Sequence, residues 1–384
     1  MFTIENSAFA AALDTLALAI ETRQPIPILD NVAIAAAPAE GAVCFTATDL
    51  DMAIDVTAAA EIASAISTTL PAAMLRKIAK AADKAALVTV TDLGNRDGDA
   101  TIDADGATYK LTTLPIGDFP KLKDMDPGKV WRFDLDADIL HNAIDATRTA
   151  ISTEETRYYL NGIFLHVHAG ELVATATDGH RMHVQSFGVV DGTADMPGVI
   201  IPTKAVKILH KLLGGRNAPK SVRVTVAPNR VDFEYGGSAF TVAVRTRTVD
   251  GTFPDYRRVC PEAGNVAEVD GAAMIKAIAK VSLVSDDKAP PVALEFGANG
   301  CTLSVAGDNG AASARIDCSW PHAALRIGFN SRYLTETLAI AGDGVALDLT
   351  DSGNPIRVTS DRVGWFAVIM PYRLRRCRGR SSSC

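Results

Sequence analysis

The chain of 384 residues is acidic overall, with 45 acidic against 38 basic residues and a formal net charge of −7. Its 48% hydrophobic and 22% charged residues are typical of a globular protein, and its length suffices for two or three cores. The acidic balance argues against a protein coated in nucleic acid, and no apolar run approaches the ~18 residues of a membrane helix. The N-terminus lacks the pattern of a secretion signal, so we expect a cytoplasmic protein whose six cysteines remain thiols.

Amphipathic segments predict helices in two recurring places along the chain. One set follows the stretches "FTIENSAF", "WRFDLDADIL" and "VAEVDGAAMI", where short polar side chains can accept bonds from first-turn amides; the candidate N-caps are Ser7, Asp136 and Asp270. A second set is predicted to begin after Pro71, Pro202 and Asn330. The nearly equal intervals between these positions indicate an internal repeat.

The tetrapeptide Thr-Ala-Thr-Asp supports the same repeat. It ends at Asp49 and again at Asp178, and Asp308 stands near the next equal step. Alternating residues before the first two aspartates predict half-buried strands that end at polar turns. The apolar residues of these strands are Val43, Phe45 and Ala47, then Leu172, Ala174 and Ala176.

These landmarks in register predict three similar units, each with antiparallel strands and two helices packed on a sheet, which is an α+β architecture. Turn-forming residues mark the joints between the units. The expected domains span 1–128, 129–264 and 265–374. A basic, serine-rich tail, 375–384, follows the third unit. We expect a disordered extension there, or a segment that folds over a nearby binding site or reaches DNA.

Basic residues concentrate on the predicted helices although the whole chain is acidic. Each set shares one helical face opposite an apolar stripe. A common reading is that these faces are merely solvated; the alternative is a surface for a polyanion such as duplex DNA. Without a recognition-helix motif or an aromatic platform, contact would not depend on sequence. The residues are Arg76, Lys77, Lys80, Arg148, Lys204, Lys207, Lys211, Lys276 and Lys280.

Several longer stretches resemble one family. They are "RQPIPILDN" (23–31), "TATDLDMAI" (46–54), "TRYYLNGIF" (156–164), "TATDGHRM" (175–182), "GTFPDYRRVCP" (251–261) and "VIMPYRL" (368–374). As a set they resemble the bacterial DNA sliding clamps, the β subunits of the replicative polymerase III holoenzyme. The resemblance implies three clamp domains per chain and a head-to-tail homodimeric ring that encircles duplex DNA. Such a protein is a processivity factor and not an enzyme, and neither a cofactor nor a metal is expected.

The resemblance also implies functional residues by matching position. DNA-facing candidates are Arg23, Tyr158, Tyr159 and Lys204. The subunit joint would pair Tyr109 and Leu111 with Leu283 and Val284, which predicts a mainly apolar joint that is weakly sensitive to salt.

A peptide-binding cleft between the second and third domains is implied as well. Its partners would be the polymerase catalytic subunit, the clamp loader, translesion polymerases and mismatch-repair proteins. The matching residues are Leu160, Thr177, Gly179, His180, Arg181, Met182, Pro254, Arg258, Val259, Asn330, Tyr333, Met370, Pro371, Tyr372, Arg373 and Leu374.

Two other functions remain open from the sequence. Asp178 and His180 could form an acid–base pair of a hydrolase, although no nucleophile motif accompanies them. The three domains could also form an interaction scaffold that does not close into a ring.

Overall fold

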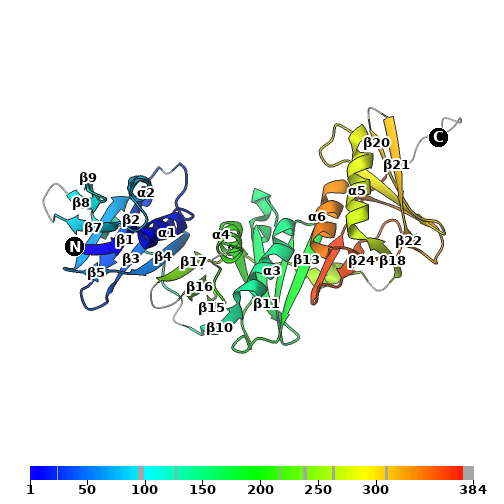
Figure 1. Ribbon diagram of the computed structural model, residues 1–384. Helices are drawn as coiled ribbons and strands as arrows, with labels where there is room; N and C mark the ends of the chain where they lie inside the picture. Colours follow the sequence, from blue (N-terminus) through cyan, green and yellow to red (C-terminus); the bar gives the residue numbers. More distant parts are fainter. Residues whose placement is uncertain are drawn as a thin grey trace. The chain divides into compact units, whose positions relative to one another are not determined.

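A computed structural model gives the fold (Figure 1), and it describes residues 1–23, 25–93, 99–125, 128–215, 218–236, 240–261, 264–307 and 310–374. The expected repeat position Asp308 and the predicted tail 375–384 lie outside these residues. Contacts divide the chain into two compact units. The first contains residues 1–141 and 191–249, and the second contains 142–190 and the residues from 250 onward.

The first unit contains two antiparallel sheets. The five-stranded sheet has the order β5 (Glu61–Ile62), β1 (Phe2–Glu5), β7 (Leu87–Asp92), β8 (Asp99–Ala104) and β9 (Ala107–Thr112). The eight-stranded sheet has the order β10 (Trp131–Asp136), β15 (Ser221–Ala227), β16 (Arg230–Gly236), β17 (Phe240–Arg247), β4 (Met52–Ala59), β3 (Ala42–Thr48), β2 (Asn31–Ala36) and β6 (Ile66–Pro71). The other elements are β14 (Val199–Pro202), α1 (Asn6–Leu16), α2 (Ala72–Ala81), α4 (Thr203–Leu213), the first part of α3 (Ala137–Thr147), η1 (Pro27–Asp30) and η2 (Ile116–Asp118).

The second unit repeats this arrangement. One sheet runs in the order β11 (Gly162–His168), β12 (Glu171–Thr177), β13 (Arg181–Gly188), β26 (Trp365–Ile369), β25 (Ile356–Ser360), β24 (Gly344–Leu349), β18 (Asn265–Asp270) and β22 (Cys318–Ser319). The other has the order β21 (Gly310–Ile316), β20 (Gly300–Gly307), β19 (Pro291–Gly297) and β23 (Leu325–Asn330). The helical elements are the end of α3, α5 (Gly271–Val281), α6 (Ser331–Ala341), η3 (Arg148–Ala150), η4 (Glu155–Leu160), η5 (Tyr256–Val259) and η6 (Ser282–Val284).

The predicted α+β class and the three repeats with two helices each are confirmed. The second helices begin directly after Pro71, Pro202 and Asn330, as predicted. Asp270 caps α5 by accepting a bond from the Ala273 amide, and the Asn330 side chain accepts from two amides of α6. Each cap satisfies amides that have no partner within the helix.

The predicted cap at Ser7 is wrong. Helix α1 begins at Asn6, and the amides of Asn6 and Ser7 donate to the carbonyl oxygens of Ala86 and Lys84. The first turn therefore already has acceptors from the loop after α2, and the Ser7 hydroxyl donates instead to Glu5 Oε1, at 2.6 Å.

The sheets continue from one repeat into the next. In the first unit β17, the last strand of the second repeat, pairs antiparallel with β4 of the first repeat. In the second unit β26, the last strand of the third repeat, pairs in the same way with β13 of the second. Both β4 and β13 directly follow a Thr-Ala-Thr-Asp turn. The middle repeat thus shares a continuous sheet with each neighbour.

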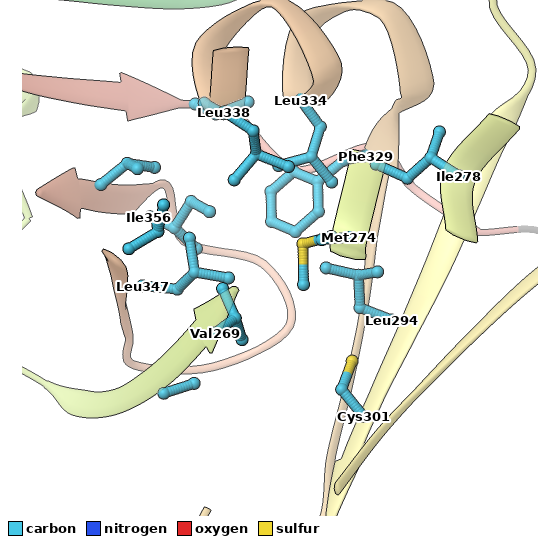
Figure 2. Packing of buried hydrophobic residues seen from close by; sticks show 14 of the residues in the cluster. Val269, Met274, Ile278, Leu294, Cys301, Phe329, Leu334, Leu338, Leu347 and Ile356 are labelled. Atoms are coloured by element: carbon cyan, nitrogen blue, oxygen red, sulfur yellow. The ribbon is translucent and has the colours of Figure 1, made fainter. Parts of the chain in front are cut away.

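Apolar side chains from both helices of the third repeat fill the core of the second unit (Figure 2). Met274 and Ile278 of α5 lie with Leu334 and Leu338 of α6 around Phe329, and all five are at most 3% exposed. Burying each such side chain contributes roughly 1.5–3 kcal/mol. The core also contacts strands on both sides of the helices, through Val269, Leu294, Cys301, Leu347 and Ile356.

Only one of the two aspartate-terminated strands is half-buried. In β3 the predicted residues Val43, Phe45 and Ala47 are fully buried and alternate with partly exposed ones, as predicted. In β12 the residues from Leu172 to Ala176 are all buried, so the prediction of a half-buried strand is wrong there. Both strands pair with neighbours on both edges, so the difference lies in the faces: burial of adjacent residues in β12 means that both of its faces are covered.

The repeated tetrapeptide forms the same hydrogen-bonded turn twice. Asp178 Oδ1 accepts bonds from the amides of His180 and Arg181, while the Thr177 hydroxyl donates to the Arg181 carbonyl. In the first repeat Asp49 Oδ1 accepts from the amides of Asp51 and Met52, and Thr48 donates to the Met52 carbonyl. The side chains of threonine and aspartate thus fix this turn, which explains why they recur together.

The turns differ at the residue with positive φ. Gly179 has a φ of 87°, whereas Leu50 adopts a φ of 84° at the equivalent position of the first repeat. A side chain is tolerated at Leu50, which is exposed, but a Cβ at Gly179 would lie 2.6 Å from Arg157 Nη1.

We predict that Gly179→Ala lowers the free energy of unfolding by about 1–2 kcal/mol, because it combines positive-φ strain with this close contact. Leu50→Ala, the matched change in the first repeat, should alter it by less than about 0.5 kcal/mol. Urea unfolding of both variants measures the difference. Equal stability of the two variants would contradict the argument.

Candidate functional site

A cavity of about 310 Å³ opens in the second unit, where β12, β13, η5 and the end of β26 meet. Its volume lies at the lower end of the range for small-ligand pockets. Apolar side chains supply much of its surface, and a few polar groups stand among them. It is lined by Arg157, Tyr159, Leu160, Thr177, Gly179, Arg181, Met182, Pro254, Asp255, Tyr256, Val259, Val368 and Met370.

Eight of the cleft residues expected from the sequence line this cavity: Leu160, Thr177, Gly179, Arg181, Met182, Pro254, Val259 and Met370. Two of them, Val259 and Met370, are large apolar residues that remain 49% and 41% exposed. Such side chains are available to a ligand without any rearrangement of the core.

One wall of the cavity is the segment around η5, held against β11 by stacked rings. Phe253 stacks on Phe164 with ring centroids 4.7 Å apart, and Phe164 stacks on His166 at 4.4 Å. The Tyr256 hydroxyl lies 3.0 Å from His166 Nε2. This packing buries Phe253 and Tyr256, so the wall has a fixed position on the sheet.

The rim near Gly179 carries an ion pair. Arg157 bonds both carboxylate oxygens of Glu154, at 2.8 and 2.6 Å, and donates to the Asp178 carbonyl at 3.3 Å. The hydrogen bond from Arg157 lowers the pKa of Glu154. A polar group therefore lies at the edge of an otherwise apolar cavity.

Arg181 lines the cavity but is only 3% exposed. Its guanidinium lies 3.2 Å from Asp178 Oδ2 and 2.5 Å from Glu336 Oε2, and it also donates to the Thr149 carbonyl. It packs 4.6 Å from the centre of the Tyr333 ring. These partners make Arg181 an internal tie between segments rather than a free group that faces a ligand.

The other expected cleft residues do not line the cavity. His180 stacks on Tyr333 at 5.9 Å, and Asn330 is engaged as the cap of α6. The Tyr372 amide donates to the Gly328 carbonyl at 2.7 Å, and Leu374 packs where a Cβ at Gly328 would otherwise lie. The segment after β26 therefore packs on β23. Pro371, Arg373 and Arg258 are likewise not among the lining residues.

Five lining residues were not expected at this site from the sequence. Tyr159 was assigned to DNA, while Arg157, Asp255, Tyr256 and Val368 were not assigned at all. Alternation along β26 places Val368 on the same side as Met370, a signal that the sequence carried. Tyr256 lies inside the quoted stretch "FPDYRRV", but only the fold shows that its ring turns toward β11.

The basic residues proposed for DNA fall into two classes. In the first unit Arg76 bonds Asp14, and Lys204 bonds Ala19, Glu21 and Asp49. In the second unit Arg148 bonds Asp145. Lys204 is therefore not on a free outward face, and Arg148 lies in η3, beyond the end of α3. Six lysines are exposed and form no ion pair with a described residue: Lys77, Lys80, Lys207, Lys211, Lys276 and Lys280.

The Asp178–His180 pair has no geometry for proton transfer. Asp178 Oδ1 accepts two backbone bonds, its Oδ2 pairs with Arg181, and the His180 ring stacks on Tyr333. Among the described residues no three His, Cys, Asp or Glu side chains gather as metal ligands. In the same part of the chain no helix is long and apolar enough to cross a membrane.

Comparison with known proteins identifies the family. Residues 1–123, 134–255 and 257–373 match the families described as the N-terminal, central and C-terminal domains of the DNA polymerase III beta subunit. The β sliding clamp of Caulobacter vibrioides is 36% identical over 382 residues, which cover 97% of this chain and 99% of that protein. The chain belongs to the bacterial β sliding clamp family. This clamp is therefore a processivity factor of DNA polymerase III and not an enzyme.

Solved clamps share the fold closely. A Caulobacter crescentus clamp superposes with a TM-score of 0.89 and 34% identity, covering 97% of this chain and 98% of that one. Its description places a polyethylene glycol at a β-motif tethering region. A Bartonella birtlesii clamp bound to griselimycin gives a TM-score of 0.88 at 32% identity, covering 97% of this chain and all of the other.

One fully buried histidine, His183, and one partly buried histidine, His166, should make the stability of this clamp depend on pH. Burial lowers the pKa of His183 to about 3 and that of His166 to about 4. An unfolded histidine takes up a proton near pH 6.5, so the unfolded state binds more protons below that pH and the folded state loses stability. For one histidine that stays neutral, the slope is about 1.4 kcal/mol per pH unit.

We predict that wild type loses stability between pH 6.5 and 4, and that His183→Gln makes this loss shallower. Urea unfolding at several pH values measures the slope. The exposed His322 provides the control, because His322→Gln should leave the slope as in wild type. A His183→Gln slope equal to that of wild type would refute the assignment.

Proposed function

We propose that two copies of this chain join head to tail in a closed ring that encircles duplex DNA, slides along it and tethers polymerases. The observation that carries this proposal is the strand pairing between repeats. The strand that follows each Thr-Ala-Thr-Asp turn pairs with the last strand of the next repeat: β4 pairs with β17, and β13 pairs with β26.

Two strands are left with an unpaired edge by this pattern. β21 follows the turn region of the third repeat and ends its sheet, and β9 ends both the first repeat and its sheet. Within the described residues neither outer edge pairs with another strand. Placing β21 of one copy beside β9 of a second copy continues the pattern, and two such joints close a ring in which neither of these two edges stays free.

Side chains near these edges support an apolar joint. Tyr109 and Leu111 share one face of β9 and are half-buried there, whereas the residues of the other face are exposed. Leu283 in η6, which packs against β21, is 83% exposed, and Val284 lies next to it. Covering these side chains with a second copy would remove apolar surface from water.

The charge distribution favours weak contacts with DNA. The six exposed lysines of α2, α4 and α5 have no carboxylate partner among the described residues, so they can approach phosphates. Arg23 and Tyr158 are also exposed. Few contacts with phosphates allow sliding, because tight neutralisation would hold the protein in one place.

We predict that wild-type protein, loaded on nicked circular DNA by a bacterial clamp loader with ATP, stays on the circle and leaves once a single cut gives free ends. Leu283→Asp should be largely monomeric in sedimentation and should not be retained. Val363→Asp, an equally exposed change elsewhere in the second unit, should behave as wild type.

Equal retention on circular and linear DNA would contradict a ring and indicate ordinary charge-driven binding. A monomeric wild-type protein that is never retained would favour the alternative of an interaction scaffold without a ring. A steep change of the dimer constant with salt would contradict the apolar joint.

The cavity in the second unit is proposed as the site that receives short peptide segments of the polymerase catalytic subunit, the clamp loader and repair proteins. An apolar hollow with exposed Val259 and Met370 and a polar rim suits an extended peptide with apolar side chains. Griselimycin, which the Bartonella relative holds, would bind the same cavity.

We predict that Val259→Asp weakens binding of griselimycin and of the polymerase catalytic subunit at least tenfold, because a carboxylate would replace an apolar contact. Val266→Asp, on an exposed position of β18 outside the cavity, should leave both affinities within twofold. Surface plasmon resonance with immobilised clamp measures both ligands. Unchanged binding in Val259→Asp would place the site elsewhere.

A further inference from the structure

The strand behind the cavity carries polar residues where apolar ones are usual. Arg181, His183 and Gln185 alternate along β13 and therefore share one face, and they are 3%, 0% and 8% exposed. Met182 lies between the first two on the opposite face, and both Arg181 and Met182 line the cavity. Buried polar side chains require partners, and here helix α6 of the third repeat supplies two of them.

Glu336 of α6 is the first of these partners. Its Oε2 lies 2.5 Å from Arg181 Nη1, while its Oε1 accepts a bond from Arg332 Nε at 3.0 Å. Arg181 is almost fully buried, whereas Arg332 is exposed on the helix surface. One carboxylate thus joins a buried arginine that lines the cavity to an exposed arginine on the helix.

Thr337, the next residue of α6, is the second partner. Its hydroxyl lies 3.0 Å from His183 Nε2, and His183 Nδ1 lies 3.1 Å from the Ala146 carbonyl at the end of α3. A neutral imidazole carries one N–H, so when Nδ1 donates to Ala146 the Nε2 atom is an acceptor. The Thr337 hydroxyl has a single proton, which it shares between His183 Nε2 and the Tyr333 carbonyl, 2.8 Å away. Both His183 and Thr337 are fully buried.

We propose that Glu336 and Thr337 are positioning residues of the peptide cavity, which act through Arg181 and His183 rather than by touching the ligand. This inference rests on the proposed function of the cavity. Glu336 and Thr337 hold β13 by the face that carries Arg181 and His183. Met182 and the turn at Gly179 therefore keep the positions that shape the cavity.

The contacts of Arg181 explain how a change at Glu336 reaches the ligand. The same guanidinium pairs with Asp178, whose other oxygen fixes the turn that contains Gly179. The carbonyl of His180, in the same turn, accepts a bond from the Met370 amide at 2.8 Å. An Arg181 side chain that loses Glu336, one of its two carboxylate partners, would shift this turn and with it two walls of the cavity.

The test is griselimycin affinity by calorimetry on the full-length protein. Glu336→Gln should weaken binding by about tenfold, an effect equivalent to about 1.4 kcal/mol. Arg332→Gln is the matched control, because it removes the exposed partner of the same carboxylate, and it should change affinity by less than twofold. Thr337→Val should weaken binding in the same direction as Glu336→Gln.

A double-mutant cycle distinguishes positioning from a general loss of stability. In an Arg181→Met background, Glu336→Gln should have no further effect on affinity, since the residue through which it acts is gone. Additive losses in the cycle, or an unchanged affinity in Glu336→Gln, would overturn the inference.

Val259→Asp separates this outcome from failure of the proposed function. If Val259→Asp abolishes binding while Glu336→Gln does not affect it, the cavity is the binding site and only the positioning role is wrong. If wild type does not bind griselimycin or the polymerase subunit, the proposed cavity function fails and this inference fails with it.

Discussion

The pairing of strands across repeat boundaries is the constraint on which the rest of the structure depends. β17 continues the sheet of the first repeat through β4, and β26 continues that of the second through β13. Because backbone groups at a buried sheet edge need partners, each repeat is completed by the next one. The first and third repeats then carry different outer strands, β9 and β21, and unlike surfaces of this kind are the condition for head-to-tail association.

The same constraint places the cavity. The turn before β13 and the segment after β26 lie side by side because these strands pair, and the stacked rings of Phe164, His166 and Phe253 bring η5 against them. A hollow with apolar walls results where one repeat meets the next in the second unit. The buried polar residues of β13 support it from behind, and their partners lie on α6 of the other repeat.

The proposed ring around DNA is consistent with the charges of this acidic protein. Several basic residues are paired with carboxylates inside the fold, among them Arg76, Arg148 and Lys204. In the proposed ring, the exposed lysines of α2, α4 and α5 would be the ones available to phosphates. A ring that holds DNA by its topology needs only such weak contacts, and strong ones would oppose sliding.

The sequence by itself determined the repeats, the helix starts after Pro71, Pro202 and Asn330, and the family. Local chemistry decides these features, since caps, turns and apolar periodicity act over a few residues. The sequence also carried the Thr-Ala-Thr-Asp turn, because its second threonine and its aspartate bond backbone groups of the same turn.

Only the tertiary structure decided which expected residues meet. Lys204 matched an outward helical face, yet carboxylates distant in sequence engage it, and Ser7 lost its capping role because the loop after α2 reaches the same amides. Arg181 matched a ligand-facing position but became an internal tie to Glu336. Long-range partners cannot be read from local patterns, because burial and charge pairing depend on segments that approach only when the sheets form.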